Sequence, residues 1–142
     1  SPYELGLGWA VKMNKKNFIG KKALEKELAR GPEWEFIGIE IEWDQLEKLY
    51  REAGLAPGLP STAWRTSTPL YYNNQQVGYA TSGAWSPILK KYIALGHLKS
   101  NFAMNGTILD FEVKIEHFRK LTKAKVVKTP FFDPKRKRSC PK

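Results

Sequence analysis

The sequence predicts a mainly β domain, either an antiparallel barrel or a closed sandwich, preceded by a short strand-helix segment. Apolar and polar residues alternate with the period of two typical of half-buried strands at residues 35–43 and 109–116. Short turn sequences, among them Asn73-Asn74 and Asn105-Gly106, separate the strand candidates. Five Trp, six Tyr and seven Phe among 142 residues provide apolar material for a packed core.

The first 31 residues predict a segment too small to form a core of its own. A short strand is expected at residues 9–13, and Asn17 is the expected N-cap of the helix that follows. Gly31 and Pro32 end that helix, because glycine suits the C-terminal cap and proline cannot continue a helix. One strand and one helix bury little surface, so this segment should pack against the rest of the chain or against sequence outside it.

A strand and a helix are expected between residues 35 and 54. Asp44 is the expected N-cap of the helix, with Glu47 as its reciprocal capping partner. The helix ends at Gly54, and a proline- and glycine-containing loop follows at residues 55–61. The alternate strand positions that should face the core are Ile37, Ile39, Ile41 and Trp43.

Five more strands are predicted along the remaining sequence. Residues 81–87 predict a turn of small and hydroxylated side chains at a barrel rim, followed by Lys90 and Lys91. Thr129-Pro130 ends the sheet, and residues 131–142 form a tail. The five strands are expected at residues 66–72, 76–81, 92–98, 109–116 and 120–128.

The formal net charge of +10 is distributed unevenly. Residues 114–142 hold eleven Lys and Arg, whereas no acid lies between Ala53 and Leu109. A basic surface attracts nucleic acid, a polyanionic ligand tail or an acidic protein, and it can also be a solvated face. The basic block at residues 135–138 alone suggests nucleic-acid binding or targeting, or a solvated chain end.

Several functional classes receive no support from the residues. His97, His117 and the single cysteine, Cys140, do not have a zinc-binding spacing. Ser82 and Ser86 lack the pattern of a nucleophile elbow, and there is no phosphate-binding loop. No apolar run approaches the roughly 18 residues of a membrane span, and the start does not have a signal-peptide pattern. The lone cysteine is expected to be an exposed thiol in a reducing, cytoplasmic compartment.

Three segments, SPYELGLGW with FIGKKAL in residues 1–24, GYATSGAWSPILKKYIALG in residues 78–96 and AKVVKTPFFDP in residues 124–134, follow one another in an order that resembles the glycine-cleavage T-protein (aminomethyltransferase) family. Residues 1–24, with SPYELGLGW and FIGKKAL, resemble the close of the family's folate-binding core. Residues 78–96 fit the pattern G-x-x-T-S-G-x-x-S-P-x-L-x-x-x-I-A-L, which resembles a signature of the family's C-terminal barrel. Residues 124–134 resemble the closing strand and its Pro-Phe tail. The ending PFFDPK resembles that of the T-like folate-dependent demethylases at least as well.

This resemblance implies a Greek-key barrel within a three-domain enzyme that binds tetrahydrofolate in a central channel. It divides the chain into the end of the folate-binding domain at residues 1–32, the barrel at 33–134 and a basic tail at 135–142. In the family, the aspartate that assists one-carbon transfer and the glutamate that holds the pterin lie outside the part that this chain matches. The chain alone is therefore expected to be inactive, with no catalytic residue and no metal.

The resemblance also implies candidate folate-binding residues. Tyr3 and Trp9 would form an aromatic wall, because the flat rings of folate stack on aromatic faces. The hydroxylated turn would line the channel, where a glycine permits close backbone approach, and cations of the acid-free stretch would meet a polyglutamate tail. The turn residues are Thr81, Ser82, Gly83 and Ser86, and the cations are Arg65, Lys90 and Lys91. Two alternatives remain open, a core role for Trp9 and a register role for the turn.

Two other functions remain open from the sequence. A basic β-barrel module would bind RNA or DNA with steep salt dependence through residues 120–128 and 135–138, although it has no nucleic-acid signature. A docking barrel would instead present its basic face to an acidic carrier protein. The sequence also leaves the one-carbon donor open among an aminomethyl-lipoyl carrier, sarcosine, dimethylglycine and a sulfonium.

Overall fold

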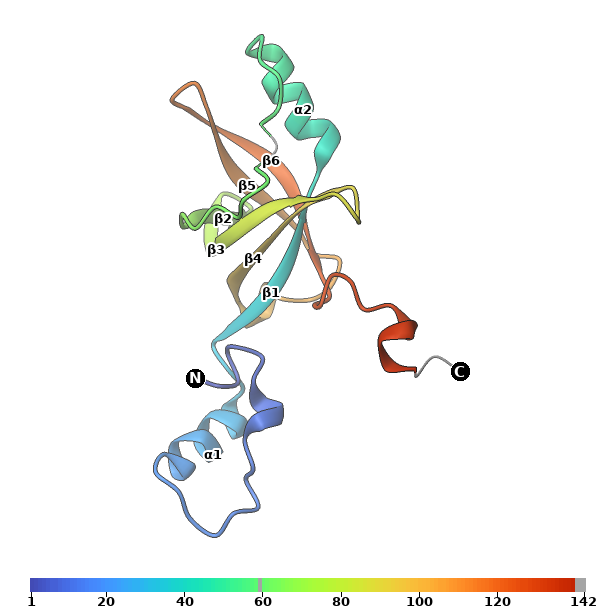
Figure 1. Cartoon of the computed structure of the whole chain (residues 1–142). Coiled ribbons are helices and arrows are strands. Elements are labelled where there is room, and N and C mark those ends of the chain that lie inside the picture. The colour runs from blue at the N-terminus through green and yellow to red at the C-terminus, as the bar shows by residue number, and fades with distance from the viewer. Residues whose placement is uncertain (59, 140–142) are drawn as a thin grey trace.

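The computed structural model describes residues 1–58 and 60–139, and a closed barrel of antiparallel strands forms its centre (Figure 1). Around the barrel the strands follow the order β1-β4-β3-β2-β5-β6. Hairpins join β2, β3 and β4, and β5 returns beside β2, which is a Greek-key connection. The predicted mainly β fold and its Greek-key barrel are therefore confirmed. The strands are β1 (Trp34–Ile41), β2 (Thr68–Tyr72), β3 (Gln75–Ser86), β4 (Lys91–Lys99), β5 (Ile108–Ile115) and β6 (Phe118–Val127).

Two α-helices lie at opposite ends of the barrel (Figure 1). Helix α1 (Lys21–Arg30) precedes β1, and α2 (Trp43–Glu52) follows it. The N-terminal segment, residues 1–33, extends from the start of β1, where the Phe36 amide donates a 2.8 Å hydrogen bond to the Glu4 carbonyl. The described part of the chain also holds three short 3-10 turns, at η1 (Gly8–Ala10), η2 (Ser100–Phe102) and η3 (Lys135–Arg138).

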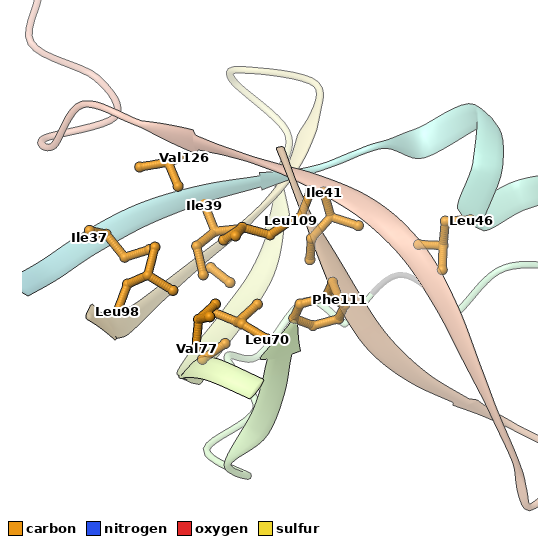
Figure 2. Packing of buried hydrophobic residues seen from close by; sticks show 13 residues of the cluster. Ile37, Ile39, Ile41, Leu46, Leu70, Val77, Leu98, Leu109, Phe111 and Val126 are labelled. Atoms are coloured by element: carbon orange, nitrogen blue, oxygen red, sulfur yellow. The ribbon is translucent and has the colours of Figure 1, made fainter. Parts of the chain in front are cut away.

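The core fills the barrel interior, and α2 contributes Leu46 at one end (Figure 2). Ile37, Ile39 and Ile41 alternate along β1 and are at most 5% exposed, which confirms the predicted period of two. Trp43 was expected on the same face, but it begins α2 and packs against Trp85 with ring centroids 5.0 Å apart. The other strands contribute Leu70, Val77, Ala80, Ala94, Leu98, Leu109, Phe111, Ala124 and Val126.

Two tight hairpins fix the register of the strands that they join. Asn73 and Asn74 adopt φ values of 48° and 62° between β2 and β3, as the two-residue hairpin turn requires. Glu116 and His117 do the same between β5 and β6, with φ values of 47° and 72°. The predicted turns at residues 73–74 and 105–106 are confirmed, and the last hairpin turn, at residues 116–117, lets β6 begin two residues before the expected residue 120.

Three local predictions are wrong. Residues 9–13 form the 3-10 turn η1 and irregular chain instead of a strand, because the closed barrel offers no free edge for pairing. Helix α1 begins after Gly20, whose φ of 89° sets the direction of entry, so Asn17 is not its N-cap. Asp44 lies in the first turn of α2, because the Glu42 carbonyl already accepts the Leu46 amide at 3.2 Å.

The ends of the chain leave some predictions untested. Cys140, expected to be an exposed thiol, lies outside the described residues. Within the basic tail, the Lys137 ammonium lies 5.6 Å from the centre of the Phe132 ring. Within the described ranges, every helix is too short or too polar to span a membrane. The boundaries proposed at residues 32 and 134 stay predictions.

Candidate functional site

The segment expected to be a hydroxylated turn is part of a strand. β3 continues to Ser86, and the turn to β4 is made by residues 87–90. The pairing of Gly83 with Ala94 and of Ser86 with Lys91 extends the β3–β4 ladder over the predicted turn. The prediction is wrong because the hydrogen bonds to β4 outweigh the local turn preference of small residues.

Two of the predicted site hydroxyls form hydrogen bonds within this chain. Thr81 lies where a bulge shifts the register between Ala80 and Ser82, and its hydroxyl donates to the Leu95 carbonyl at 3.2 Å. The Ser86 hydroxyl oxygen accepts a hydrogen bond from the Leu89 amide at 3.3 Å across the turn. These bonds favour the register role for both side chains. Ligand contact by Ser82 stays a prediction.

Gly83 permits a close approach, but the approaching group belongs to this chain. A Cβ at Gly83 would lie 2.5 Å from Cζ2 of the Trp64 indole. The two residues also exchange backbone hydrogen bonds, with Trp64 donating at 3.0 Å and Gly83 donating at 3.3 Å. Sequence reasoning missed Trp64, because the contact joins a loop to a strand that is distant along the chain.

Trp64 also borders a cavity at the α2 end of the barrel. Its indole Nε1 donates a 2.7 Å hydrogen bond to the hydroxyl of Tyr92. Beside this pair lies a cavity of about 450 Å³, called here the aromatic cavity. Tyr50, Phe111 and Arg119 line it together with Trp64 and Tyr92. The cavity combines flat apolar walls with polar groups, which is typical of small-molecule sites.

The hydroxyl of Tyr92 is held in its neutral form. Burial raises the pKa of Tyr92 above its ordinary value, although the hydrogen bond from Trp64 acts in the opposite direction. Because the pKa of Tyr92 is higher in the folded state than in the unfolded state, its phenol ionises more easily once the protein has unfolded. The stability contribution of Tyr92 is therefore complete below about pH 10 and is lost as the pH rises through the folded pKa.

We expect the unfolding free energy to fall more steeply above about pH 10 in the unaltered chain than in Tyr92→Phe. The substitution removes the phenol that titrates differently in the two states. Urea denaturation at pH 8, 10 and 11 measures the effect. Tyr72→Phe, at a side chain that is 37% exposed, controls for the loss of one phenol. If the unfolding free energy fell equally steeply with pH in the unaltered protein and in Tyr92→Phe, the raised pKa of Tyr92 would be contradicted.

The cations of the acid-free stretch differ in their pairing. Arg65 and Lys90 are exposed, and Lys90 ends the β3–β4 turn with a φ of 52°. Lys91 instead forms a 2.6 Å ion pair with Glu40 on β1, which competes with the predicted role toward a polyglutamate tail. On β6, Lys123 pairs with Asp110 at 2.5 Å, so part of the basic surface is neutralised internally.

The two aromatic residues of the predicted folate wall lie in the N-terminal segment. Trp9 is 84% exposed on η1, so the alternative of a core role within this chain is wrong. The Tyr3 ring lies against Gly8, where a Cβ would come within 2.9 Å of it. Its hydroxyl is buried and has no hydrogen-bond partner among the residues that the structure describes.

The structure does not bring the N-terminal aromatics and the β3–β4 residues together. Trp34, where β1 starts after the N-terminal segment, pairs with Lys99, while Ile41 at the other end pairs with Tyr92 beside the β3–β4 turn. Seven residues of β1, or about 23 Å, therefore separate Trp34 from the β3–β4 turn, and Ser82 and Gly83 lie four to five residues, or about 13–17 Å, along the strand from Trp34. Within this chain they form two separate groups.

No group of three or more His, Cys, Asp or Glu side chains within residues 1–58 and 60–139 could hold a metal ion. His97 lies between the rings of Phe36 and Tyr79, with centroids at 5.5 and 5.7 Å. Its Nδ1 is buried without a hydrogen-bond partner in the described structure.

Comparison with known proteins gives consistent matches. Residues 51–133 match the family model described as the glycine cleavage T-protein C-terminal barrel domain. Aminomethyltransferases from Bacillus pumilus and Prochlorococcus marinus are each 38% identical over 133 residues, or 93% of this chain. The crystal structure of glycine cleavage system aminomethyltransferase T from Bartonella henselae covers 93% of the chain with a TM-score of 0.71 at 24% identity, a likeness of fold.

The matches cover only part of the length of each relative. The chain spans 31% and 30% of the two aminomethyltransferases, and 32% of the Bartonella chain. The family model covers β2 to β6, and thus most of the barrel described above. The chain therefore belongs to the family of glycine cleavage T-protein C-terminal barrel domains.

Proposed function

We propose that this chain is the C-terminal part of a tetrahydrofolate-dependent aminomethyltransferase, or of a related folate-dependent demethylase. The curated relatives are aminomethyltransferases, and they match 133 of the 142 residues. A match of that length must reach beyond the barrel into the N-terminal segment. The proposal therefore concerns the N-terminal segment as well as the barrel.

The observation that carries the proposal is the exposed apolar surface of the N-terminal segment. Trp9 is 84% exposed and Ile19 is fully exposed, although the barrel beside them has a closed and complete core. Exposed apolar patches of this kind mark interaction sites. A folate-binding unit would cover this surface and present Trp9 to the ligand. The other large apolar side chains exposed here are Leu5, Leu7 and Leu28.

In this proposal Tyr3 and Trp9 contribute the aromatic wall, and Arg65 and Lys90 remain the exposed cations available to a polyglutamate tail. The hydroxylated part of β3 supports the channel wall, with Ser82 as its candidate ligand contact. Catalytic groups and the one-carbon donor site belong to the rest of the enzyme, and an acidic carrier protein would be a further partner, met by the basic face of the barrel. The chain alone would be inactive, and the enzyme would work in the cytoplasm.

We expect Trp9→Ala, made in the complete natural protein, to weaken tetrahydrofolate binding about 3- to 10-fold, the value of one aromatic stacking contact. Trp9→Phe should retain most of the affinity, because it keeps a flat ring. Phe118→Ala is the matched control, since Phe118 is also an exposed aromatic residue, at 69%, but lies on the distant β5–β6 hairpin. Isothermal titration calorimetry measures the affinities of the unaltered protein and the three variants.

A second titration tests the proposed function as a whole. Tetrahydrofolate should quench the tryptophan fluorescence of the complete protein and leave that of the isolated chain nearly unchanged. An unchanged affinity in Trp9→Ala would remove Trp9 from the site while leaving a folate enzyme. Absence of any response in the complete protein would refute folate binding itself.

A further inference from the structure

We propose that the aromatic cavity binds a flat aromatic molecule that carries an anionic group. The cavity's volume of about 450 Å³ lies within the range of roughly 300–1,000 Å³ found for small-molecule sites. Leu46 and Tyr50 of α2 line it, whereas the N-terminal segment, which carries Tyr3 and Trp9, extends from the other end of the barrel, where β1 begins (Figure 1). The proposed ligand site is therefore separate from the aromatic wall of Tyr3 and Trp9, although Arg65, a candidate cation for the polyglutamate tail, lies in the chain between the lining residues Trp64 and Thr66.

Rigid aromatic rings form the wall of the cavity. The Trp64 indole is held by its bond to the Tyr92 hydroxyl and by the two-way backbone bridge to Gly83. On another side it meets the Phe111 ring, with centroids 6.2 Å apart and planes at 47°. Tyr50 of α2 adds a further ring to the lining. A wall fixed before the ligand arrives loses little conformational entropy on binding, and flat faces favour a flat ligand.

The cavity exists because two neighbouring strands diverge. β2 and β5 pair at Leu70 with Phe111 and at Tyr71 with Asp110. On the far side of this pairing, residues 66–69 and residues 112–114 line the cavity from its two sides. Three consecutive hydroxyl-bearing residues, Thr66 to Thr68, lie along this opening and offer hydrogen bonds to a polar edge of the ligand.

The charges along the cavity favour an anion. Lys114 and Arg119 line it together with one acid, Glu112. Nε of Arg119 lies 3.7 Å from a Glu112 carboxylate oxygen, and the Arg119 side chain is 71% exposed while that of Glu112 is 11% exposed. A guanidinium has five donors in one plane, so a single contact through Nε leaves donors for a second carboxylate, sulfonate or phosphate group.

Two probes that share one ring system test the proposal. 8-Anilinonaphthalene-1-sulfonate carries the anion, and N-phenyl-1-naphthylamine lacks it. The complete natural protein is labelled with ¹⁵N-tryptophan, and the Trp64 indole signal is assigned by its loss in Trp64→Phe. Titration of the sulfonate should shift the Trp64 signal to saturation. A shift of the Trp9 signal without one at Trp64 would place the probe elsewhere and overturn the proposal.

Substitution of one cation then tests whether the cavity recognises the anionic group of the ligand. Arg119→Met keeps the aliphatic stem and should weaken the sulfonate about 10-fold, while the neutral probe changes less than about twofold. Lys120→Met is the matched control, because the neighbouring lysine is exposed on the same hairpin but does not line the cavity, and it should change neither affinity. Equal losses in both variants, or no loss in Arg119→Met, would overturn a specific anion contact.

Discussion

We expect Gly78→Ala to lower the unfolding free energy by about 3 kcal/mol or more, the upper range for overpacking in a core. A Cβ at Gly78 would lie 2.3 Å from the backbone oxygen of His97 and 3.0 Å from Cα of Leu98. Both atoms belong to the backbone of β4, and Gly78 pairs directly with Leu98. Relief of the contact would therefore require the β3–β4 ladder itself to separate, because no flexible side chain can move aside.

Gly58→Ala provides the control for the entropy that any glycine replacement changes. No atom lies within 4 Å of a Cβ built at Gly58, and its φ is outside the left-handed range. Its unfolding free energy should stay within about 0.5 kcal/mol of the unaltered protein. Guanidinium denaturation monitored by circular dichroism compares the three proteins. If Gly78→Ala matched Gly58→Ala, the tight approach of β3 to β4 would be refuted.

The barrel strands were predictable because their pattern is local. On β1 and β5 the alternation of Ile and Leu positions with charged ones follows directly from the pleat of a strand, and the structure buries Ile39 and Leu109 as expected. The tight turn at Asn73-Asn74 was predictable for a similar reason, because asparagine tolerates positive φ. Both signals depend only on neighbouring residues.

The course of residues 81–86 was not predictable in the same way. Thr81, Ser82 and Gly83 have the local preference of a turn, yet pairing with β4 keeps them in a strand. The role of Gly83 becomes clear only once the Trp64 indole lies on it. Contacts between residues distant along the chain thus determine both the conformation of this segment and the role of its residues.

The same limit applies to the candidate sites. The aromatic cavity draws Tyr50, Trp64, Tyr92 and Phe111 from a helix, a loop and two strands, so no spacing in the sequence marks it. Charge counts also mislead, since Lys91 reads as a free cation but is paired with Glu40 across β4 and β1. By contrast, the aromatic pair Tyr3 and Trp9 came from a family resemblance, and its ligand contact stays a prediction.

The second large effect is expected at the centre of the core. Ile39 is 0% exposed, and its strand pairs with β4 on one side and β6 on the other, opposite Ala94 and Val126. Ile39→Ala should lower the unfolding free energy by about 2–5 kcal/mol, because the lost methyl and methylene groups leave a cavity between strands that cannot collapse. Ile39→Val should cost only about 0.5–1.5 kcal/mol.

The difference in unfolding free energy between Ile39→Ala and Ile39→Val separates the loss of core packing from other causes of destabilisation. Valine keeps the β-branched shape that suits a strand, so its smaller cost would measure the removed methylene alone. Alanine removes more volume at the same backbone position and should shift the denaturation midpoint several times further, with an unchanged dependence on denaturant concentration. Similar small losses in both variants would mean that the barrel closes over the vacated space. That outcome would contradict the rigid, doubly paired position of β1 on which the closed barrel depends.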